Sequence, residues 1–252
     1  MKFYKYGNVE NPKIMFLHGV LTPWHILTPQ IEHFKERYYV IVPALNGHDG
    51  EKSEFISIEQ EARQIEDDYL SRHGDSIFAL CGLSMGGLIA FQIWKNQRIK
   101  IDHLVMDGAP LVPSGKFMTT MMTKFYLRIV HQSQKRDEKT LLRFGRHFLP
   151  KKYLAPYLNI IDQMSDETVK NMVKSTGNVR LEEGIAVDGT RLLYIYGTKM
   201  NEMLSKKSAK LMEKYYPGTV FIRCENCTHL YYAVFKPEKW NSMVESFLIS
   251  EE

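Results

Sequence analysis

The sequence has 252 residues, a formal net charge of +4 at pH 7 and 44% hydrophobic residues. This length and composition are typical of a globular protein with one large core. The mild positive charge gives no reason to expect a nucleic-acid partner. No apolar run approaches the ~20 residues that cross a bilayer, so no integral membrane contact is expected.

The N-terminal residues bear on the cellular location, and the cysteines bear on metal and cofactor binding. Residues 1–7 lack the apolar segment of a secretory signal and are typical of a strand, so a cytoplasmic location is expected. Cys224 and Cys227 have C-x-x-C spacing, but no second Cys/His pair at zinc spacing accompanies them. We therefore expect core cysteines, no metal site and no cofactor.

Short β-rich apolar runs alternate with amphipathic segments along most of the chain. The apolar runs predict buried parallel strands at 13–17, 38–42, 77–81, 101–106, 192–196 and 220–224. The amphipathic segments predict helices at 26–36, 57–72, 88–95, 205–215 and 237–247, the second of them with an N-cap at Ser57. This alternation predicts an α/β fold with a doubly wound, mostly parallel sheet.

One long stretch, residues 111–189, breaks the alternation. It has helical periodicity at 117–130, 139–148, 153–163 and 166–175, and it contains no good strand. No internal repeat, low-complexity tract or flexible linker separates it from the rest. We therefore expect one structural unit, with a core of residues 1–110 and 190–252 and a helical insertion at 111–189.

The most informative motif is Gly82-Leu83-Ser84-Met85-Gly86, which follows one apolar run and precedes a helix-like run. Strand, G-x-S-x-G and helix in this order are the context of a nucleophile elbow. A serine hydroxyl is a poor nucleophile unless it is held at an exposed tip beside a base. A sharp turn holds it there, in a backbone conformation that costs roughly 1–3 kcal/mol.

The order of the surrounding motifs strengthens this interpretation, because the pentapeptide alone arises by chance in about one such chain in ten. His18-Gly19 ends the first buried apolar run, well before the serine. His229 follows the last predicted strand. A nucleophile that precedes its histidine is the chain order of α/β-hydrolases, in contrast to other Ser-His-Asp folds.

On these motifs the chain resembles α/β-hydrolases of the small, lid-bearing esterase, lipase and thioesterase kind, over nearly its whole length. Residues 43–50 are similar to the family's P-x-x-x-G-H-G segment, with Asp49 where a glycine is usual. The resemblance implies a helical lid after the sixth strand, formed here by 111–189. It also implies a hydrolase of carboxylic esters or thioesters.

The resemblance assigns roles to four residues. Ser84 would attack an acyl carbonyl, and His229 would act as general base and then as general acid. The backbone N–H groups of Val20 and Met85 would form the oxyanion hole. His18 and His48 are expected to support the neighbouring loops.

The third member of the triad is ambiguous. The resemblance predicts an acid just past the penultimate strand in a G-x-x-D pattern, but Met200 occupies that position. Glu202 could serve if the loop shifts by two residues. Asp107, which follows the strand at 101–106, is the favoured candidate, because some lipases of this family carry their acid there. A chain without an acid is the remaining alternative.

The insertion is rich in methionine and aromatic residues and in positive charge. The apolar side chains either pack against the sheet or in part line an acyl pocket; they are Phe117, Met118, Met121, Met122, Phe125, Tyr126, Tyr153, Tyr157, Met164 and Met172. Residues 116–152 hold ten Lys/Arg against two acids. That excess forms either a solvated face or a surface that attracts anionic substrates or lipid.

The favoured function is hydrolysis of carboxyl esters or thioesters of small or medium apolar acyl groups through an acyl-enzyme. One alternative is a degenerate hydrolase that binds a small molecule, motivated by Met200. Another is a lyase or peroxidase on the same scaffold. The expected partner is a small-molecule acyl ester or thioester, and the sequence leaves the physiological substrate and the oligomeric state open.

Overall fold

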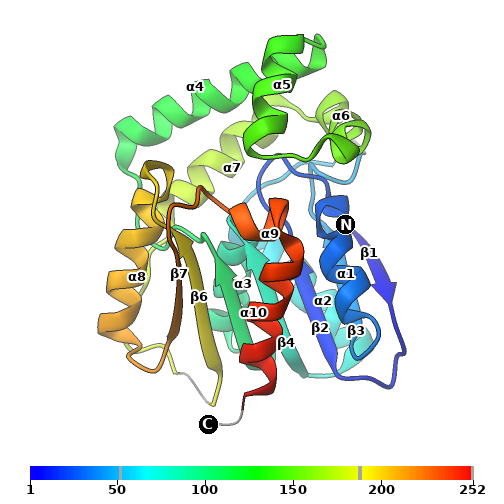
Figure 1. Cartoon of the computed structure of the whole chain (residues 1–252), viewed down its shortest axis with the longest axis vertical. Helices are drawn as coiled ribbons and strands as arrows, with labels where there is room; N and C mark the ends of the chain where they lie inside the picture. Colours follow the sequence, from blue (N-terminus) through cyan, green and yellow to red (C-terminus); the bar gives the residue numbers. More distant parts are fainter. Residues whose placement is uncertain (51–52, 187–188, 251–252) are drawn as a thin grey trace.

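The computed structural model describes residues 1–50, 53–186 and 189–250. These residues form a seven-stranded sheet in the order β1-β3-β2-β4-β5-β6-β7 (Figure 1). Strand β1 pairs with β3 in the antiparallel sense, and all other pairs are parallel. The strands are β1 (Lys2–Tyr6), β2 (Lys13–Leu17), β3 (Tyr39–Ala44), β4 (Ser76–Leu83), β5 (Lys100–Asp107), β6 (Arg191–Gly197) and β7 (Val220–Cys224). The predicted doubly wound, mostly parallel sheet is confirmed.

Helices cover both faces of this sheet (Figure 1). They are α1 (Thr28–Phe34), α2 (Ile58–His73), α3 (Met85–Asn96), α8 (Met203–Tyr215), α9 (Tyr231–Phe235) and α10 (Pro237–Ile249), with 3₁₀ turns η1 (Trp24–Leu27) and η3 (Met200–Glu202). Helix α10 packs against α1, and α2 packs against α3. The Ser57 hydroxyl accepts a hydrogen bond from the Gln60 N–H at 3.2 Å, which confirms the predicted N-cap of α2.

The core lies on both sides of the central strands, as a parallel sheet between two helix layers requires. Two tryptophans fill it, Trp94 from α3 and Trp240 from α10, each no more than 2% exposed. A buried indole N–H needs an acceptor. Trp94 donates to the Thr190 hydroxyl at 3.2 Å, and Trp240 donates to the Asp107 carboxylate at 2.9 Å.

The helical insertion lies between β5 and β6, over one end of the sheet (Figure 1). Its helices are α4 (Gly115–Gln134), α5 (Glu138–His147), α6 (Leu154–Gln163) and α7 (Asp166–Asn178), with the 3₁₀ turn η2 (Lys151–Tyr153). It therefore follows the fifth strand of the described chain instead of the sixth, because only four described strands precede β5. None of the helices in the described ranges is long and apolar enough to cross a membrane.

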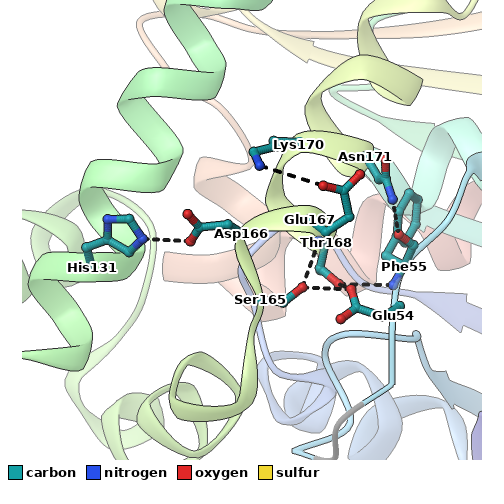
Figure 2. Close-up of polar contacts among 9 residues, drawn as sticks. All are labelled: Glu54, Phe55, His131, Ser165, Asp166, Glu167, Thr168, Lys170 and Asn171. Atoms are coloured by element: carbon teal, nitrogen blue, oxygen red, sulfur yellow. Dashed lines mark hydrogen bonds and ion pairs between the residues drawn. The ribbon is translucent and has the colours of Figure 1, made fainter.

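Helix α7 is tied to the loop that precedes α2 (Figure 2). The Glu54 carboxylate accepts hydrogen bonds from the hydroxyls of Ser165 at 2.7 Å and Thr168 at 2.6 Å. The backbone of Phe55 also takes part, because its N–H donates to Thr168 and its carbonyl accepts from the Asn171 amide. These contacts hold the N-terminal part of α7 against the loop that precedes α2.

The turn from β4 into α3 is the tightest crossing in the sheet. A Cβ atom at Gly86 would collide with the carbonyl oxygens of Leu17 and His18, at the end of β2. A Cβ atom at Gly82 would collide with the backbone of Gly86 and Gly87. Glycine is therefore the residue that lets strand and helix approach each other at both positions.

We predict that Gly86→Ala lowers the free energy of unfolding by about 3 kcal/mol, because backbone atoms cannot yield to the added methyl group. Gly145→Ala is the matched control, since a Cβ there meets no atom within 4 Å in the interior of α5. It should raise stability by about 0.5–1 kcal/mol. Urea unfolding of both variants measures the difference, and equal midpoints would contradict this account of the turn.

Candidate active site

Ser84 occupies the turn between β4 and α3 in a strained backbone conformation, with φ 53° and ψ −114°. A positive φ is uncommon for a residue with a side chain and marks stored strain when the surroundings enforce it. Here the Ser84 N–H donates to the Asp107 carbonyl at 2.8 Å, and the Ser84 carbonyl accepts from Leu88 at 3.2 Å. The geometry is that of a nucleophile elbow.

Ser84 and His229 line the same pocket, which the insertion covers. The rest of its polar lining comes from Gly19 and Thr22, in the loop after β2. Its apolar walls come from the core, from α4 and α5 and from the segment around α9; they are Val20, Ile26, Leu83, Phe125, Tyr126, Ile129, Phe144, Phe148, Leu230 and Val234. A mostly apolar cleft with a few convergent polar groups is the usual form of a small-molecule site.

Some apolar side chains of the insertion pack in the core, and others line the pocket that contains Ser84. Phe125 and Tyr126 are the members of the predicted set that line the pocket. The buried members that contribute to the core are Tyr153, Tyr157, Met164 and Met172. Phe117 and Met121 are exposed. Packing against the core and lining a pocket, the two roles that the sequence left open, are therefore taken by different residues.

The imidazole of His229 is held by a buried carboxylate. Its Nδ1 lies 2.5 Å from the Glu202 Oε1, and the Glu202 side chain is fully buried. The ring also lies close over Gly108, where an added Cβ would stand 2.6 Å from the His229 Cε1. With Nδ1 bound to Glu202, the other ring nitrogen, Nε2, can accept a proton from another group.

Hydrogen bonds between two loops bring Glu202 to this position. After β6, the Lys199 N–H donates to the Cys227 carbonyl at 3.1 Å, and the Thr198 hydroxyl accepts from the Asn226 N–H at 2.8 Å. The 3₁₀ turn η3 then begins, and the Glu202 N–H donates back to the Lys199 carbonyl at 3.1 Å. The loops after β6 and β7 are thus joined, and their side chains meet at His229.

Asp107, the acid favoured from the sequence, makes a different contact. Its Oδ2 accepts the hydrogen bond from the Trp240 indole, and it has no hydrogen bond to His229. Burial, reinforced by the negative charge of Glu202, raises the pKa of Asp107 to about 7. The structure therefore differs from our expectation: Glu202 contacts His229, and Asp107 supports α10 and, through its carbonyl, the Ser84 turn.

Electrostatics around His229 favour its protonated form. Burial alone would lower the pKa of His229 because it disfavours the charged ring. The hydrogen bond and charge of Glu202, with the charge of Asp107, outweigh burial and raise that pKa above its ordinary value. The site is therefore arranged to stabilise an imidazolium at this position.

His18 supports the loop after β2. Its Nε2 accepts the Leu45 N–H at 3.2 Å, so this nitrogen carries no proton. The opposite nitrogen, Nδ1, is 3.0 Å from the Gly19 carbonyl and donates to it. Burial is the main cause that lowers the pKa of His18 to about 3, and the ring is neutral.

His48 supports the same loop from the other side. Its Nε2 accepts the Leu21 N–H at 3.1 Å, and its Nδ1 donates to the Asn46 carbonyl at 3.1 Å. Burial lowers the pKa of His48 to about 4. Both histidines therefore link the loops after β2 and β3, as the sequence analysis expected.

The two predicted oxyanion donors belong to the loop after β2 and to the start of α3. Val20 lines it and belongs to the loop that the two buried histidines hold. Met85 is the first residue of α3, where a backbone N–H has no acceptor within the helix. A helix N-terminus also favours negative charge. Met85 also directly follows Ser84 in the chain.

The C-x-x-C pair lies beside the site, and its two cysteines form no disulfide. Cys224 and Cys227 are buried free thiols. Burial is the main cause that raises the pKa of Cys224 to about 12. Over the described ranges, no cluster of three or more histidine, cysteine or acidic side chains could hold a metal ion.

No family sequence model and no curated protein sequence matches the chain, but many solved structures do. An alpha/beta hydrolase family protein from Desulfitobacterium hafniense has a TM-score of 0.78 at 18% identity and covers 98% of this chain and 100% of its own. A carboxylesterase from Nitrososphaera gargenis has a TM-score of 0.74 at 13% identity, with 98% and 93% covered. A thermophilic esterase from Thermogutta terrifontis has a TM-score of 0.73 at 18% identity, with 98% and 92% covered.

The chain has the α/β-hydrolase fold. The resemblance stated from the sequence is confirmed at this level, and the structural neighbours are hydrolases and esterases. At such low identity the likeness shows the fold alone. One fold hosts many chemistries, so function has to be argued from the site.

Two residues of the site were not recognised, or not favoured, from the sequence. Glu202 was weighed but ranked below Asp107, because Met200 occupies the position where the family pattern has its acid. Gly108 was not identified, although the Asp-Gly pair at 107–108 is a turn signal that could have marked it. Its positive φ of 65° and the nearby imidazole both favour glycine there.

We predict that the buried histidines make the protein sensitive to acid. Their pKa values lie below 6.5 in the folded state, so their contribution is complete above pH 6.5 and is lost as the pH falls towards 4 and 3. Each histidine can lower the unfolding free energy by up to about 1.4 kcal/mol per pH unit in that window. Urea unfolding at pH 7, 6, 5 and 4.5 measures the slope.

The control is His48→Gln, whose amide can accept the Leu21 N–H but does not titrate. Its stability at pH 7 should be lower than that of the wild type, and its loss between pH 6.5 and 4.5 should be smaller. An unchanged slope in this variant would show that His48 does not contribute to the acid sensitivity.

Proposed function

We propose that this protein is a serine hydrolase that cleaves carboxyl esters or thioesters of apolar acyl groups through an acyl-enzyme. The single observation that carries the proposal is the buried Glu202 carboxylate bound to the Nδ1 of His229, in a pocket that also contains Ser84. A nucleophile, a base and a group that orients the base are the three parts that such chemistry requires.

The proposed reaction uses these groups in sequence. Ser84 Oγ attacks the acyl carbonyl while its proton passes to the Nε2 of His229. The N–H groups of Val20 and Met85 stabilise the oxyanion that forms. His229 then protonates the leaving oxygen or sulfur, and the same ring activates the water that releases the acid from Ser84. Glu202 stabilises the imidazolium at both steps.

The pocket walls support an apolar acyl group as the substrate. Phe125, Phe144 and Phe148 come from the insertion and face the same cavity as Ser84. An apolar enclosure excludes water from the acyl-enzyme and strengthens the electrostatic interactions inside it. We propose on this basis that residues 111–189 act as the lid of the site.

The competing proposal, a degenerate hydrolase that only binds a small molecule, was motivated by Met200 in the position of the acid. Glu202 supplies a carboxylate at the imidazole from two residues later. Ser84 also keeps a strained conformation that a binding protein does not need. We therefore favour catalysis over binding.

We predict that Glu202→Gln lowers kcat by about 10³–10⁴-fold, because an amide cannot stabilise the imidazolium or hold the required tautomer. Asp107→Asn should lower kcat by less than about tenfold, since the amide oxygen can still accept the Trp240 N–H. Turnover of p-nitrophenyl butyrate measures both, and thermal melting confirms that each variant is folded. The opposite ranking would assign the acid to Asp107.

Labelling by a fluorophosphonate tests the nucleophile itself. The wild type should react rapidly at one site, because only an activated serine attacks this reagent quickly. Ser84→Ala should not be labelled and should have no esterase activity above background. A wild-type protein that resists labelling would support the binding-protein alternative.

We predict a specific pH dependence from the raised pKa of His229. The base must be neutral to accept the Ser84 proton, so kcat/KM should fall as the pH drops below a midpoint that lies above 6.5. Glu202→Gln removes the hydrogen bond and charge that raise this pKa, so the residual activity should have its midpoint at lower pH. A midpoint that does not move would show that Glu202 does not control the ring.

A further inference from the structure

A second cavity in the insertion adjoins the catalytic pocket. It lies between α4 and α5, and four of its lining residues, Phe125, Ile129, Phe144 and Phe148, also line the catalytic pocket. The two cavities therefore share one apolar wall.

The rest of this cavity is polar and strongly basic. Arg128 from α4 and Lys139 and Arg143 from α5 line it, with Asp137 as the single acid among its lining residues. Three cations and one carboxylate give a net charge of +2. We call this cavity the basic groove.

The carboxylate in the groove is already engaged by the backbone. Asp137 is the N-cap of α5, and its side chain accepts the Thr140 N–H at 2.8 Å. Arg128, Lys139 and Arg143 form no salt bridge with any acid within the described ranges, in contrast to Arg136, which binds Asp162 through two nitrogens at 2.8 and 2.7 Å. Asp137 supplies one counter-charge, which acts on Arg128 and Lys139, and the groove keeps a net charge of +2.

We infer that the basic groove binds an anionic group of the substrate. This inference rests on the proposed function, because it names the substrate class of the same site. The substrate is an ester or thioester in which an apolar segment separates the reacting carbonyl from a carboxylate or phosphate. The apolar segment lies along the shared phenylalanine wall, and the anion lies between α4 and α5.

The donors in the groove suit such an anion. Guanidinium groups bind carboxylate and phosphate oxygens through two parallel hydrogen bonds, and two arginines from different helices face one cavity here. The lysine adds a point charge. The three cations are exposed, and all of them line a cavity that shares four lining residues with the catalytic pocket.

An anionic membrane is the competing partner for positive charge on the insertion. Of the exposed apolar side chains of the insertion that could enter a membrane, Phe117, Met121 and Leu142 lie outside the groove, and Phe125 and Phe148 line it. The groove cations instead adjoin the pocket of Ser84. The observations therefore favour a single small molecule that occupies both cavities.

The test compares p-nitrophenyl esters of one chain length that end in a methyl group, a carboxylate or a phosphate. For the wild type, we expect kcat/KM to be at least tenfold higher for one or both anionic esters than for the methyl-ended ester, mainly through KM. The carboxylate and phosphate arms identify which anion the groove prefers. A preference for the methyl-ended ester would overturn the inference.

A matched pair of double variants locates the effect. Arg128→Gln with Arg143→Gln should reduce the preference for the anionic ester towards unity. Lys124→Gln with Arg146→Gln removes the same charge from the same two helices, at positions that are exposed like Arg128 and Arg143 but lie outside the groove, and it should keep the wild-type preference. An equal loss in both double variants would assign the preference to the overall field of the insertion and overturn the groove.

A binding experiment separates this inference from the proposed function. Ser84→Ala protein is titrated calorimetrically with octyl phosphate, octanoate and octanol. Binding of an anion at least tenfold tighter than octanol, lost in the Arg128/Arg143 variant, supports the groove even if no ester is hydrolysed. Anions that bind no tighter than octanol overturn it, as does binding confined to phosphatidylglycerol vesicles, which would make the membrane the partner.

Discussion

The site depends on how closely α3 crosses the end of β2. Gly86 lies against the carbonyl oxygens of Leu17 and His18, and this contact fixes the angle at which the chain leaves β4. The turn that results puts Ser84 between the loop after β2 and the end of β5, where the Asp107 carbonyl accepts its N–H. One steric constraint therefore sets the position of Ser84, the strain in its backbone and its place beside the loop after β2.

His229 and Glu202, the proposed base and its acid, come from the other half of the sheet, and a different kind of contact positions them. Hydrogen bonds from Lys199 to Cys227 and from Asn226 to Thr198 join the loops after β6 and β7, so the loops that carry Glu202 and His229 are held together. Asp107 lies near enough for its charge to affect the pKa of His229, while its own pKa is raised by burial. Only one of the two buried carboxylates needs to be ionised for the histidine to be held, which limits the cost of burying both.

Local patterns were enough to predict the sheet, the elbow and the helices of the insertion, because alternation, helical periodicity and a glycine pair depend on neighbouring residues. The acid depends on contacts between segments that are far apart in the chain. Glu202 lies two residues beyond the family pattern, at the end of the 3₁₀ turn Met200–Glu202. It reaches His229 because the loops after β6 and β7 are joined, in part by the hydrogen bond between Lys199 and Cys227, which no local pattern indicates. For the same reason, the sequence could not tell that Phe125 faces the pocket while Tyr157 fills the core.

The charges of the insertion are distributed unevenly, and this bears on what the site accepts. Glu54 of the core accepts from Ser165 where the insertion meets the core, and within the insertion Asp166 pairs with His131 and Arg136 pairs with Asp162 (Figure 2 shows the first two). The groove between α4 and α5 is the opposite case, since its one acid caps a helix and its three cations have no salt bridge within the described ranges. Like charges gathered in a cavity oppose folding unless a counter-charge enters. A substrate with an anionic end supplies that charge, so the same interaction that selects the substrate also stabilises the part of the insertion that covers Ser84.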